Sequence, residues 1–421
     1  MSEIHNENPE SEEGKGAKPR LWVVTELYYP EETSTGYYLT RIAEGLSDDL
    51  EVKAICGQPN YSSRGLRASK REIRNGVEIF RAAGTTLNKN VILFKLINMI
   101  TLSFSIFLKS VFRFRPGDRI LVVTTPPSLP FVVALAALIR GSQYTLLIHD
   151  NYPEILFAVG KLKESSTLAT FLNYFNRWLF KHASKIIAVG RDMEELLESK
   201  TDGLDIPISV IPNWAELETV EPQPREENSL LRELGISEKF VFLYAGNMGY
   251  PNDIETILES AVGLSTIKTI HFIFLGTGVK EHWLRRETAK LGLTNITILQ
   301  PKPRAEQIVF LNACDVGLVS LVTKMRGVSM PSRTYNIMAA GKPILALTEP
   351  ESELALVIDE DAIGWHIVPG DSDGLAVLIE SIYKQRNKIA AMGDRSRVVA
   401  LERYSLETAI LGYKKAFDLI T

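Results

Sequence analysis

Residues 326–347 read Arg-Gly-Val-Ser-Met-Pro-Ser-Arg-Thr-Tyr-Asn-Ile-Met-Ala-Ala-Gly-Lys-Pro-Ile-Leu-Ala-Leu, and the rest of the chain is organised around them. Pro331 suits the first position of a helix, where its missing N–H costs nothing, and apolar residues follow at helical spacing as far as Gly341. The apolar run 344–347 is typical of a strand buried on both faces. The stretch therefore predicts a short helix that starts near Ser332 and leads into a buried strand.

Cations gather beside the start of this helix. A helix N-terminus offers unpaired backbone N–H groups and the positive end of the macrodipole. Lys324, Arg326 and Arg333 add side-chain charges there, so the residues are compatible with a site for a diphosphate next to Ser332. The alternative, which periodicity alone favours, is an ordinary helix-to-strand connection whose arginines face water.

Size and composition allow two domains. The chain has 421 residues, of which 45% are hydrophobic, a normal content for a globular protein. Its net charge is −4, but the charge is unevenly distributed. Residues 61–120 form a basic block, with twelve Lys or Arg and three Asp or Glu. The first 18 residues are rich in glutamate, have almost no apolar content and lack the apolar core of a signal peptide, which predicts a disordered tail.

The cysteines and the longest apolar runs indicate a cytosolic protein. Cys56 and Cys314 have no neighbouring Cys or His at a metal-ligand spacing, so a reducing compartment fits best. The uncharged run 120–139 is long enough to span a bilayer, but three prolines divide it into a strand, a turn and a helix. The run 96–108 is apolar but too short to span.

Strand-like apolar runs alternate with helical patterns along the whole chain, which predicts parallel sheets. The runs are 21–25, 52–56, 77–81, 120–124, 144–149, 185–189 and 208–212, followed by 240–245, 271–275, 296–299, 316–321 and 343–347. We expect an α/β protein with two doubly wound Rossmann-like domains that face a cleft, because ligands of such sheets sit outside the carboxyl ends of the strands.

Composition also sets the predicted domain boundaries. They are an acidic tail at 1–19, a first domain at 20–215, a linker at 216–230, a second domain at 231–402 and a C-terminal helix at 403–421. The linker is assigned from its prolines and five glutamates.

The stretch 326–347 resembles the nucleotide-sugar-binding segment of glycosyltransferase family four. Ala339-Ala340-Gly341-Lys342-Pro343 fits the end of the family pattern well. The two glutamates of that pattern are absent, because Val328 stands at the first position and Asn336 at the second, which binds ribose in the family. The donor site must therefore differ in detail.

Further signatures follow in the family's order from Leu21 to the C-terminus. They are Tyr28-Tyr29-Pro30 with Thr35-Gly36, Gln58-Pro59-Asn60-Tyr61, Val210-Ile211-Pro212-Asn213-Trp214, Tyr244–Gly249, Phe274–Gly278 and Leu299-Gln300-Pro301. The one at 58–61 resembles a turn of the branch that builds O-antigen and exopolysaccharide, including fucosamine-type transferases. In the first loop of the second domain, Asn247 takes the place of an arginine found in many members.

The resemblance implies a GT-B fold whose terminal helix crosses back to the first domain. It implies a retaining glycosyltransferase that uses a nucleotide-diphosphate sugar, with UDP expected, and needs neither metal nor cofactor. The donor-binding residues that it implies are Gly36, Gly246, Asn247, Gly276, Gln300, Lys324, Arg326, Ser332, Arg333, Asn336 and Glu353. The catalytic candidates are His149, Asp150 and Arg326.

Three of these assignments have alternatives. The pair His149-Asp150 follows a predicted strand, where catalytic residues commonly project, but it could equally cap the next helix. Glu353 aligns with a family glutamate, yet a first-turn carboxylate that favours a helix N-terminus explains it better. Asp371-Ser372-Asp373 mimics a metal-binding motif of another transferase fold, and is interpreted as a turn with a helix cap.

The expected partners are the donor, a polyprenyl-diphosphate-linked glycan as acceptor, and the inner membrane surface, with no nucleic acid. Residues 89–115 combine an apolar run with basic borders that include Lys109, Arg113 and Arg115, which is typical of salt-sensitive peripheral binding at the cytoplasmic face. The alternative is a helix buried against the sheet with snorkelling ends. For the whole chain, a nucleotide-sugar epimerase and a non-catalytic nucleotide-sugar-binding protein remain the alternative functions.

Overall fold

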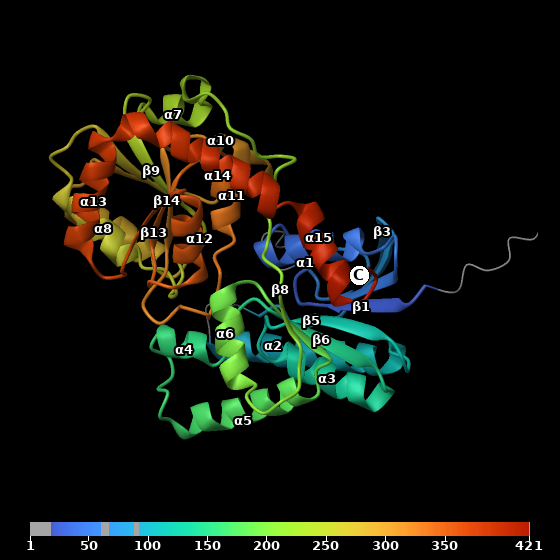
Figure 1. The fold of residues 1–421 in the computed structure, drawn as a ribbon. Helices are drawn as coiled ribbons and strands as arrows, with labels where there is room; N and C mark the ends of the chain where they lie inside the picture. Colours follow the sequence, from blue (N-terminus) through green and yellow to red (C-terminus); the bar gives the residue numbers. More distant parts are fainter. Residues whose placement is uncertain (1–17, 60–66, 88–91, 421) are drawn as a thin grey trace, which may run out of the picture.

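The computed structural model describes residues 18–59, 67–87 and 92–420. Almost all of the predicted tail at 1–19, and the second half of the turn at 58–61, lie outside these residues. Two parallel-dominated sheets, each flanked by helices, make up the described chain (Figure 1). We call the part that contains β1–β8 the first domain and the part that contains β9–β14 the second domain.

The first sheet has eight strands in the order β3-β4-β2-β1-β5-β6-β7-β8, and all neighbours are parallel except β3 and β4. The strands are β1 (Arg20–Val24), β2 (Glu51–Cys56), β3 (Arg71–Arg74), β4 (Val77–Arg81), β5 (Arg119–Val123), β6 (Gln143–Ile148), β7 (Lys185–Ala188) and β8 (Ile208–Val210). The central strands are buried on both faces, which is why they read as continuous apolar runs.

The second sheet has six parallel strands in the order β11-β10-β9-β12-β13-β14. They are β9 (Phe240–Ala245), β10 (Ile270–Leu275), β11 (Ile296–Leu299), β12 (Val316–Ser320), β13 (Ile344–Leu347) and β14 (Gly364–Ile367). In both sheets the strand order reverses next to the first strand of the domain, and loops at such a switch point bind ligands in open α/β sheets.

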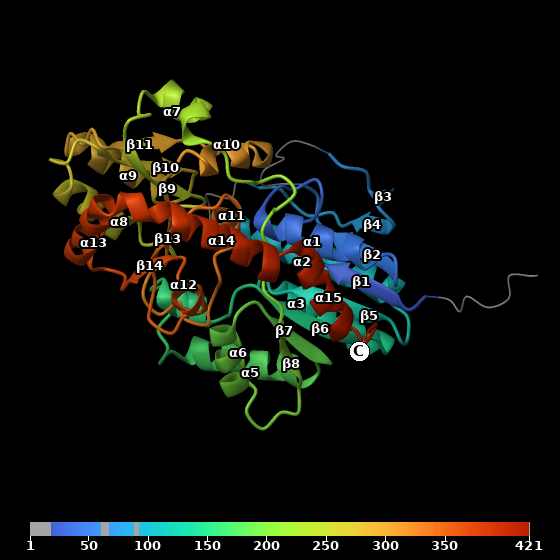
Figure 2. The same ribbon diagram turned by 45° about the horizontal axis from the view of Figure 1, so that its top comes forward.

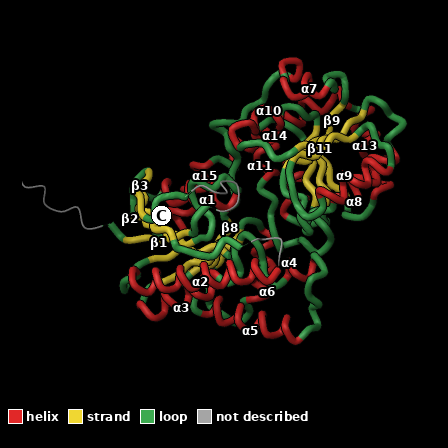
Figure 3. The backbone as a smooth tube through the Cα atoms, turned by 180° about the vertical axis from the view of Figure 1, so that it is seen from behind, coloured by secondary structure: helices red, strands yellow, loops and turns green. Residues whose placement is uncertain are grey.

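Helices cover both faces of each sheet. In the first domain they are α1 (Ser34–Gly45), α2 (Ile92–Arg113), α3 (Leu129–Arg140), α4 (Glu154–Ala158), α5 (Thr167–Lys181) and α6 (Arg191–Lys200). Those that follow are α7 (Ser229–Leu234), α8 (Ile254–Gly263), α9 (Glu281–Lys290), α10 (Gln307–Leu311), α11 (Arg333–Ala339), α12 (Glu353–Asp361), α13 (Ser372–Lys384), α14 (Ile389–Arg403) and α15 (Leu406–Ala416). Helices α2, α3 and α5 lie together on one side of the first sheet (Figure 3).

The last helix returns to the first domain. Helix α14 runs along the second domain and α15 continues from it to lie beside α1 (Figure 2). Lys185 Nζ donates to the carbonyl of Ala416 at 2.6 Å, and Lys414 forms an ion pair of 2.8 Å with Asp49. The C-terminal segment therefore fastens the two domains together, and it does so beside the segment that joins them, because Ala215 N donates to Tyr404 O at 2.8 Å.

The predicted strands are all present, and the alternation of strand and helix confirms the predicted fold class. Strands β3 and β14 were not predicted. The first is short, polar and antiparallel, and the second is a four-residue edge strand, so neither has a long apolar run. The Asp371 side chain accepts from Gly374 N at 2.8 Å, which confirms the predicted helix cap.

Two details differ from the sequence prediction. The apolar run 96–108 belongs to a 22-residue helix, α2, and within the described residues Leu93–Arg113 is the one helix long and apolar enough to cross a bilayer. The segment predicted as a polar linker is packed, because Val220 is buried and the Asn312 side chain bonds the backbone of Glu221 and Gln223. Composition alone did not reveal these contacts.

Candidate functional site

Helix α11 begins where the sequence predicts. Ser332 is its N-cap residue, Arg333 opens its first turn, and Gly341 adopts a positive φ of 63° directly after it. The Ser332 hydroxyl contacts the Ser34 hydroxyl at the start of α1, at 2.9 Å. Because α11 has only seven residues, its macrodipole is small, and the charge of nearby side chains matters more for an anion.

Arg333 is the cation that points into the second domain's glycine loops. Its guanidinium lies 4.4 Å from the ring centroid of Tyr244, and its Nη2 donates to Asn252 Oδ1 at 3.3 Å. Its Nη1 is buried and has no hydrogen-bond partner among the described residues. A buried donor without a partner is costly, so this nitrogen is a natural place for an anionic ligand.

Two glycines make room for this arrangement. Gly246 and Gly276 end β9 and β10, and each has a φ of +149°, which a residue with a side chain rarely adopts. A Cβ on Gly246 would stand 2.9 Å from Arg333 Cζ, and a Cβ on Gly276 would stand 1.9 Å from the Gly246 carbonyl oxygen. The next residue, Asn247, is exposed, and its carbonyl accepts from Tyr244 Oη at 2.7 Å.

The end of β6 meets the second domain. Asp150 forms an antiparallel bridge with Ser329, and Asn151 donates its backbone N–H to Val328 O at 2.8 Å and its side chain to Gly327 O at 2.7 Å. Helix α4 is capped by Pro153 without a side-chain bond, so the alternative that His149-Asp150 caps this helix is wrong.

His149 and Asp150 are both partly buried at the domain junction. Burial lowers the pKa of His149 to about 4, and its Nε2 has no partner among the described residues. Burial raises the pKa of Asp150, against hydrogen bonds from Ser329 and Thr125 that lower it. The pair thus offers a neutral imidazole and a carboxyl group at the junction between the domains.

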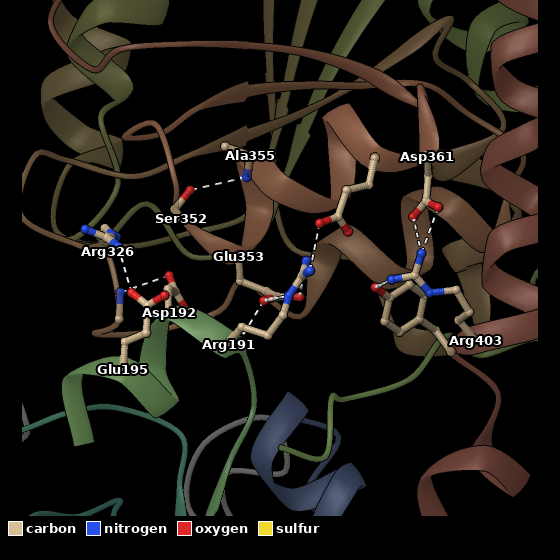
Figure 4. A network of polar contacts seen from close by, with 12 residues as sticks. Arg191, Asp192, Glu195, Arg326, Ser352, Glu353, Ala355, Asp361 and Arg403 are labelled. Carbon is tan, nitrogen blue, oxygen red and sulfur yellow. Dashed lines mark hydrogen bonds and ion pairs between the residues drawn. The ribbon is translucent and has the colours of Figure 1, made fainter. Parts of the chain in front are cut away.

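Lys324 and Arg326 are engaged elsewhere. Lys324 Nζ lies 2.8 Å from Glu164 Oε1, and Arg326 Nη2 lies 2.7 Å from Glu195 Oε2, so each pairs with a glutamate of the first domain. Figure 4 shows Arg326 beside Glu195, at the start of α6. The sequence placed these charges at the start of α11; the structure places them in ion pairs across the domain junction. Their role at a diphosphate stays a prediction.

Glu353 also holds the domains together. Its Oε2 accepts from Arg191 N at 2.8 Å and from Arg191 Nε at 2.9 Å, while Arg191 Nη1 reaches Glu360 at 2.7 Å (Figure 4). Gly190, the N-cap of α6, provides no side-chain cap, so this carboxylate does so from the other domain. Its oxygens are occupied by Arg191 within the protein, and a role of Glu353 at the donor stays a prediction.

Asn336 faces a carboxylate that the sequence did not reveal. Its Nδ2 donates to Glu216 Oε1 and to Gln307 Oε1, both at 2.8 Å, and its Oδ1 accepts from Glu216 N at 3.0 Å. Glu216 is buried, and Arg304 Nε donates to its Oε2 at 2.7 Å. The amide is therefore fully bonded within the protein.

This Glu216 cluster was missed because its members are far apart in sequence. Glu216 was assigned to the linker, and Arg304 follows a strand end with no distinguishing motif. Arg304 also lies 3.7 Å from the ring centroid of Tyr37 and donates to Glu32 O at 3.3 Å, so the cluster joins α1, the segment after β8 and α11. No local signal in the sequence could have indicated these partners.

Two further predicted residues have local roles. Gln300 is exposed, and its Nε2 donates to Glu281 Oε1 at 3.0 Å at the start of α9. Gly36 lies in the first turn of α1, where a Cβ would stand 2.7 Å from the Glu31 carbonyl oxygen. Gly36 lies near the switch-point strand β1, whereas Gln300 follows the edge strand β11, and among the described residues Gln300 does not contact Arg333.

The chain matches two family descriptions in succession. Residues 34–214 match the glycosyl transferase 4-like domain, and residues 227–399 match the glycosyl transferases group 1. The chain is 32% identical over 393 residues to the probable glycosyltransferase WbjE of Pseudomonas aeruginosa, which covers 92% of this chain and 94% of the relative. The chain belongs to this glycosyltransferase family. It is therefore a transferase of glycosyl groups.

Two other proteins support the assignment. A putative colanic acid biosynthesis glycosyl transferase, WcaI of Escherichia coli K12, is 25% identical over 345 residues, which cover 78% of this chain and 83% of WcaI. HepE of Anabaena, solved in complex with UDP and glucose, has a TM-score of 0.71 at 15% identity and covers 96% of this chain and all of its own. The likeness to HepE shows the GT-B fold, and the predicted family and fold are confirmed.

We predict that Asn336→Glu destabilises the protein, even though it restores the glutamate of the family pattern at this position. The new carboxylate would stand at hydrogen-bond distance from the buried Glu216, and like charges in a desolvated site repel. Asn336→Glu combined with Glu216→Gln restores one amide and one carboxylate. A double-mutant cycle in urea should give a coupling on the order of 1–3 kcal/mol.

The second single variant of this cycle is Glu216→Gln, which loses the ion pair with Arg304 but introduces no repulsion. If Asn336→Glu unfolds at the wild-type urea concentration, the cluster does not exist as described. The other substitution expected from the family pattern, Asn336→Ala, should raise the donor KM.

We predict that His149 contributes to the loss of stability in acid. Because its folded pKa of about 4 lies below the usual value of roughly 6.5, the unfolded chain binds this proton more readily. The stability is therefore full above about 6.5 and falls as the pH drops toward 4. Urea unfolding of His149→Gln should lose less stability over this range than the wild type. A parallel pH dependence in both proteins would contradict it.

Proposed function

We propose that this transferase moves a sugar from a UDP-sugar to a hydroxyl of a lipid-linked glycan, with retention at the anomeric carbon. The observation that carries the proposal is the buried, unpartnered Nη1 of Arg333 beside the loop of Gly246. Diphosphate oxygens would satisfy this donor with charge-assisted bonds. The complex of HepE with UDP and glucose supports a UDP donor.

In the proposed reaction the bond between the anomeric carbon and the diphosphate oxygen breaks, and a bond to the acceptor oxygen forms on the same face of the sugar. The acceptor hydroxyl proton passes to the departing diphosphate. Negative charge develops on that diphosphate, where Arg333 stabilises it, so the proposal needs no metal or cofactor. Retention rests on the resemblance to family four.

His149 and Asp150 would face the sugar from the first domain. The imidazole is neutral at physiological pH because burial lowers its pKa, so it can donate or accept one hydrogen bond without adding charge. Its unpartnered Nε2 is a candidate contact for a sugar hydroxyl. Asp150 directly follows His149, and its Oδ2 accepts a hydrogen bond from Thr125 Oγ1 at 3.4 Å.

The acceptor would enter from the first domain. A cavity of about 330 Å³ lies at the carboxyl ends of β1, β2, β5 and β6, and Thr125, Tyr152 and Asn98 are among its lining residues. Thr125 also bonds Asp150, so this cavity adjoins the proposed sugar site. The name of WcaI, which places that relative in colanic acid biosynthesis, supports a cell-surface polysaccharide as the product.

We further propose a cytoplasmic enzyme at the inner membrane surface, with a polyprenyl diphosphate carrying the acceptor. The proposed donor site takes Arg333 from the second domain and His149 and Asp150 from the first. We propose no role for nucleic acid. An epimerase or a non-catalytic binding protein is less well supported, because family membership and the relatives indicate a transferase.

We predict that Arg333→Ala lowers kcat/KM for a UDP-sugar at least tenfold. Each lost charge-assisted bond contributes on the order of 1.5–3 kcal/mol. Arg326→Ala is the matched control, since its exposed ion pairs are worth roughly 1 kcal/mol or less. The assay is slow donor hydrolysis with a panel of nucleotide sugars, followed by product analysis.

Normal turnover of Arg333→Ala would remove the proposed diphosphate site. An equal loss in Arg326→Ala would instead show that Arg326 leaves Glu195 when the donor binds, as the family pattern suggested. A product that is an isomerised nucleotide sugar, formed without an acceptor, would identify an epimerase.

A further inference from the structure

Three helices of the first domain carry an unusual share of the exposed apolar surface. Of the 27 large hydrophobic side chains that are exposed among the described residues, 14 lie on α2, α3 and α5. They include Phe112, which is 79% exposed, Tyr174, which is 72% exposed, and Phe104, which is 61% exposed. Scattered exposed apolar residues are ordinary, but a concentration of this kind marks an interaction surface.

The exposed residues form stripes along their helices. On α2 they recur at positions 93, 96, 100, 104, 108 and 112, a spacing of three or four residues that keeps them on one face. On α5 they recur at 168, 171, 174 and 175. The opposite face of α2 packs inward, because Leu102 and Ile106 belong to the buried core.

The three stripes belong to one layer. Helix α3 packs against both α2 and α5, and all three lie on the same side of the first sheet (Figures 1 and 3). On α3 the exposed residues are Leu135, Leu138 and Ile139, while Val133 and Ala137 face the core. Their outward faces therefore form one apolar surface, which we call the α2-α3-α5 face.

The charge on this layer has a single sign. The helices contain 22, 12 and 15 residues, and none of these is Asp or Glu. The whole chain has 51 acidic residues in 421, so 49 residues of average composition would hold about six. The same helices contain six basic residues, namely Lys95, Lys109, Arg113, Arg140, Arg177 and Lys181.

We propose that the α2-α3-α5 face docks on an anionic lipid bilayer and inserts its apolar side chains among the headgroups. A bilayer surface offers both an apolar layer and negative charge, which match this face. A second copy of the chain matches it less well, because two such faces would bring six cations against six. The inference rests on exposure and charge, and not on the proposed reaction.

The face lies on the membrane and does not cross it. One side of α2 is packed into the domain, and α3 spans only about 18 Å, less than the roughly 30 Å of a hydrocarbon core. Lys95, Asn98 and Leu102 of α2 also line the cavity of about 330 Å³. These residues lie on the side of α2 opposite the exposed stripe, so docking leaves α2 between that cavity and the lipid headgroups, a separation of about 10 Å.

Apolar insertion by three helices differs from the binding expected from the basic ends of α2 alone. Arg113 stacks on Phe80, with its Cζ 4.4 Å from the ring centroid, and Lys109 is partly buried, where burial lowers its pKa. Reversing these charges would disturb the fold as well as the surface. Exposed apolar residues are the better variants, because they make fewer contacts within the protein.

The test is flotation of the full-length protein with vesicles of equal parts phosphatidylglycerol and phosphatidylcholine, at low and high sodium chloride. The wild type should float at low salt, and a fraction should remain bound at high salt because salt does not screen apolar insertion. The double substitution Phe171→Asp with Tyr174→Asp on α5, and Phe104→Asp on α2, should each weaken binding about tenfold or more.

Val377→Asp on α13 and Leu411→Asp on α15 are matched controls, since these residues are 70% and 52% exposed on other helices. They should bind as the wild type does. Thermal melting and donor hydrolysis without vesicles should be unchanged in all variants, which separates a failure of docking from a failure of the proposed reaction.

Two results would overturn the proposal. One is a wild-type protein that does not bind these vesicles at low salt. The other is equal binding by wild type and the α5 variant. If the wild type sediments as a dimer that the α5 variant abolishes, and vesicles do not bind, the face serves a second copy of the chain instead.

Discussion

Backbone pairing between Asp150 and Ser329 fixes how the two domains meet. Together with the two bonds from Asn151 to Gly327 and Val328, it attaches the loop that leads into α11 to the end of β6. His149 lies at one side of this pairing, and Arg333 begins the helix on the other. Both carry a buried nitrogen without a partner among the described residues, so the junction brings together two groups that a ligand could satisfy.

Much of the fold could be predicted because the sheets are parallel. Strands such as β5 and β9 are buried on both faces, so each appears in the sequence as an uninterrupted apolar run between helical patterns. Strand β3 does not have such an apolar run. It is an edge strand with the sequence Arg-Glu-Ile-Arg, and its pairing with β4 depends on a neighbour and not on its own apolar content.

The site was only partly predictable, since the sequence shows which charges exist but not what they contact. Gly246 and Arg333 were identified through loops whose geometry is local. Lys324 and Arg326 look equivalent to Arg333 in sequence, yet their partners, Glu164 and Glu195, lie 160 and 131 residues away. An ion pair between distant segments leaves no periodic or spacing signal, so only the folded chain distinguishes a charge that is already paired from one that is not.

The same limit explains the Glu216 cluster and the α2-α3-α5 face. The basic block at 61–120 is visible in the sequence, but it contains only three of the six cations on these helices, and α5 has no conspicuous net charge for its length. The absence of Asp and Glu from these helices is informative only because the structure places the three helices in one layer. Around the junction, by contrast, several acids are bonded across the domains, as Glu353 is to Arg191 and Glu195 to Arg326. The chain thus uses carboxylates to hold its domains together and has none on the three helices of the α2-α3-α5 face.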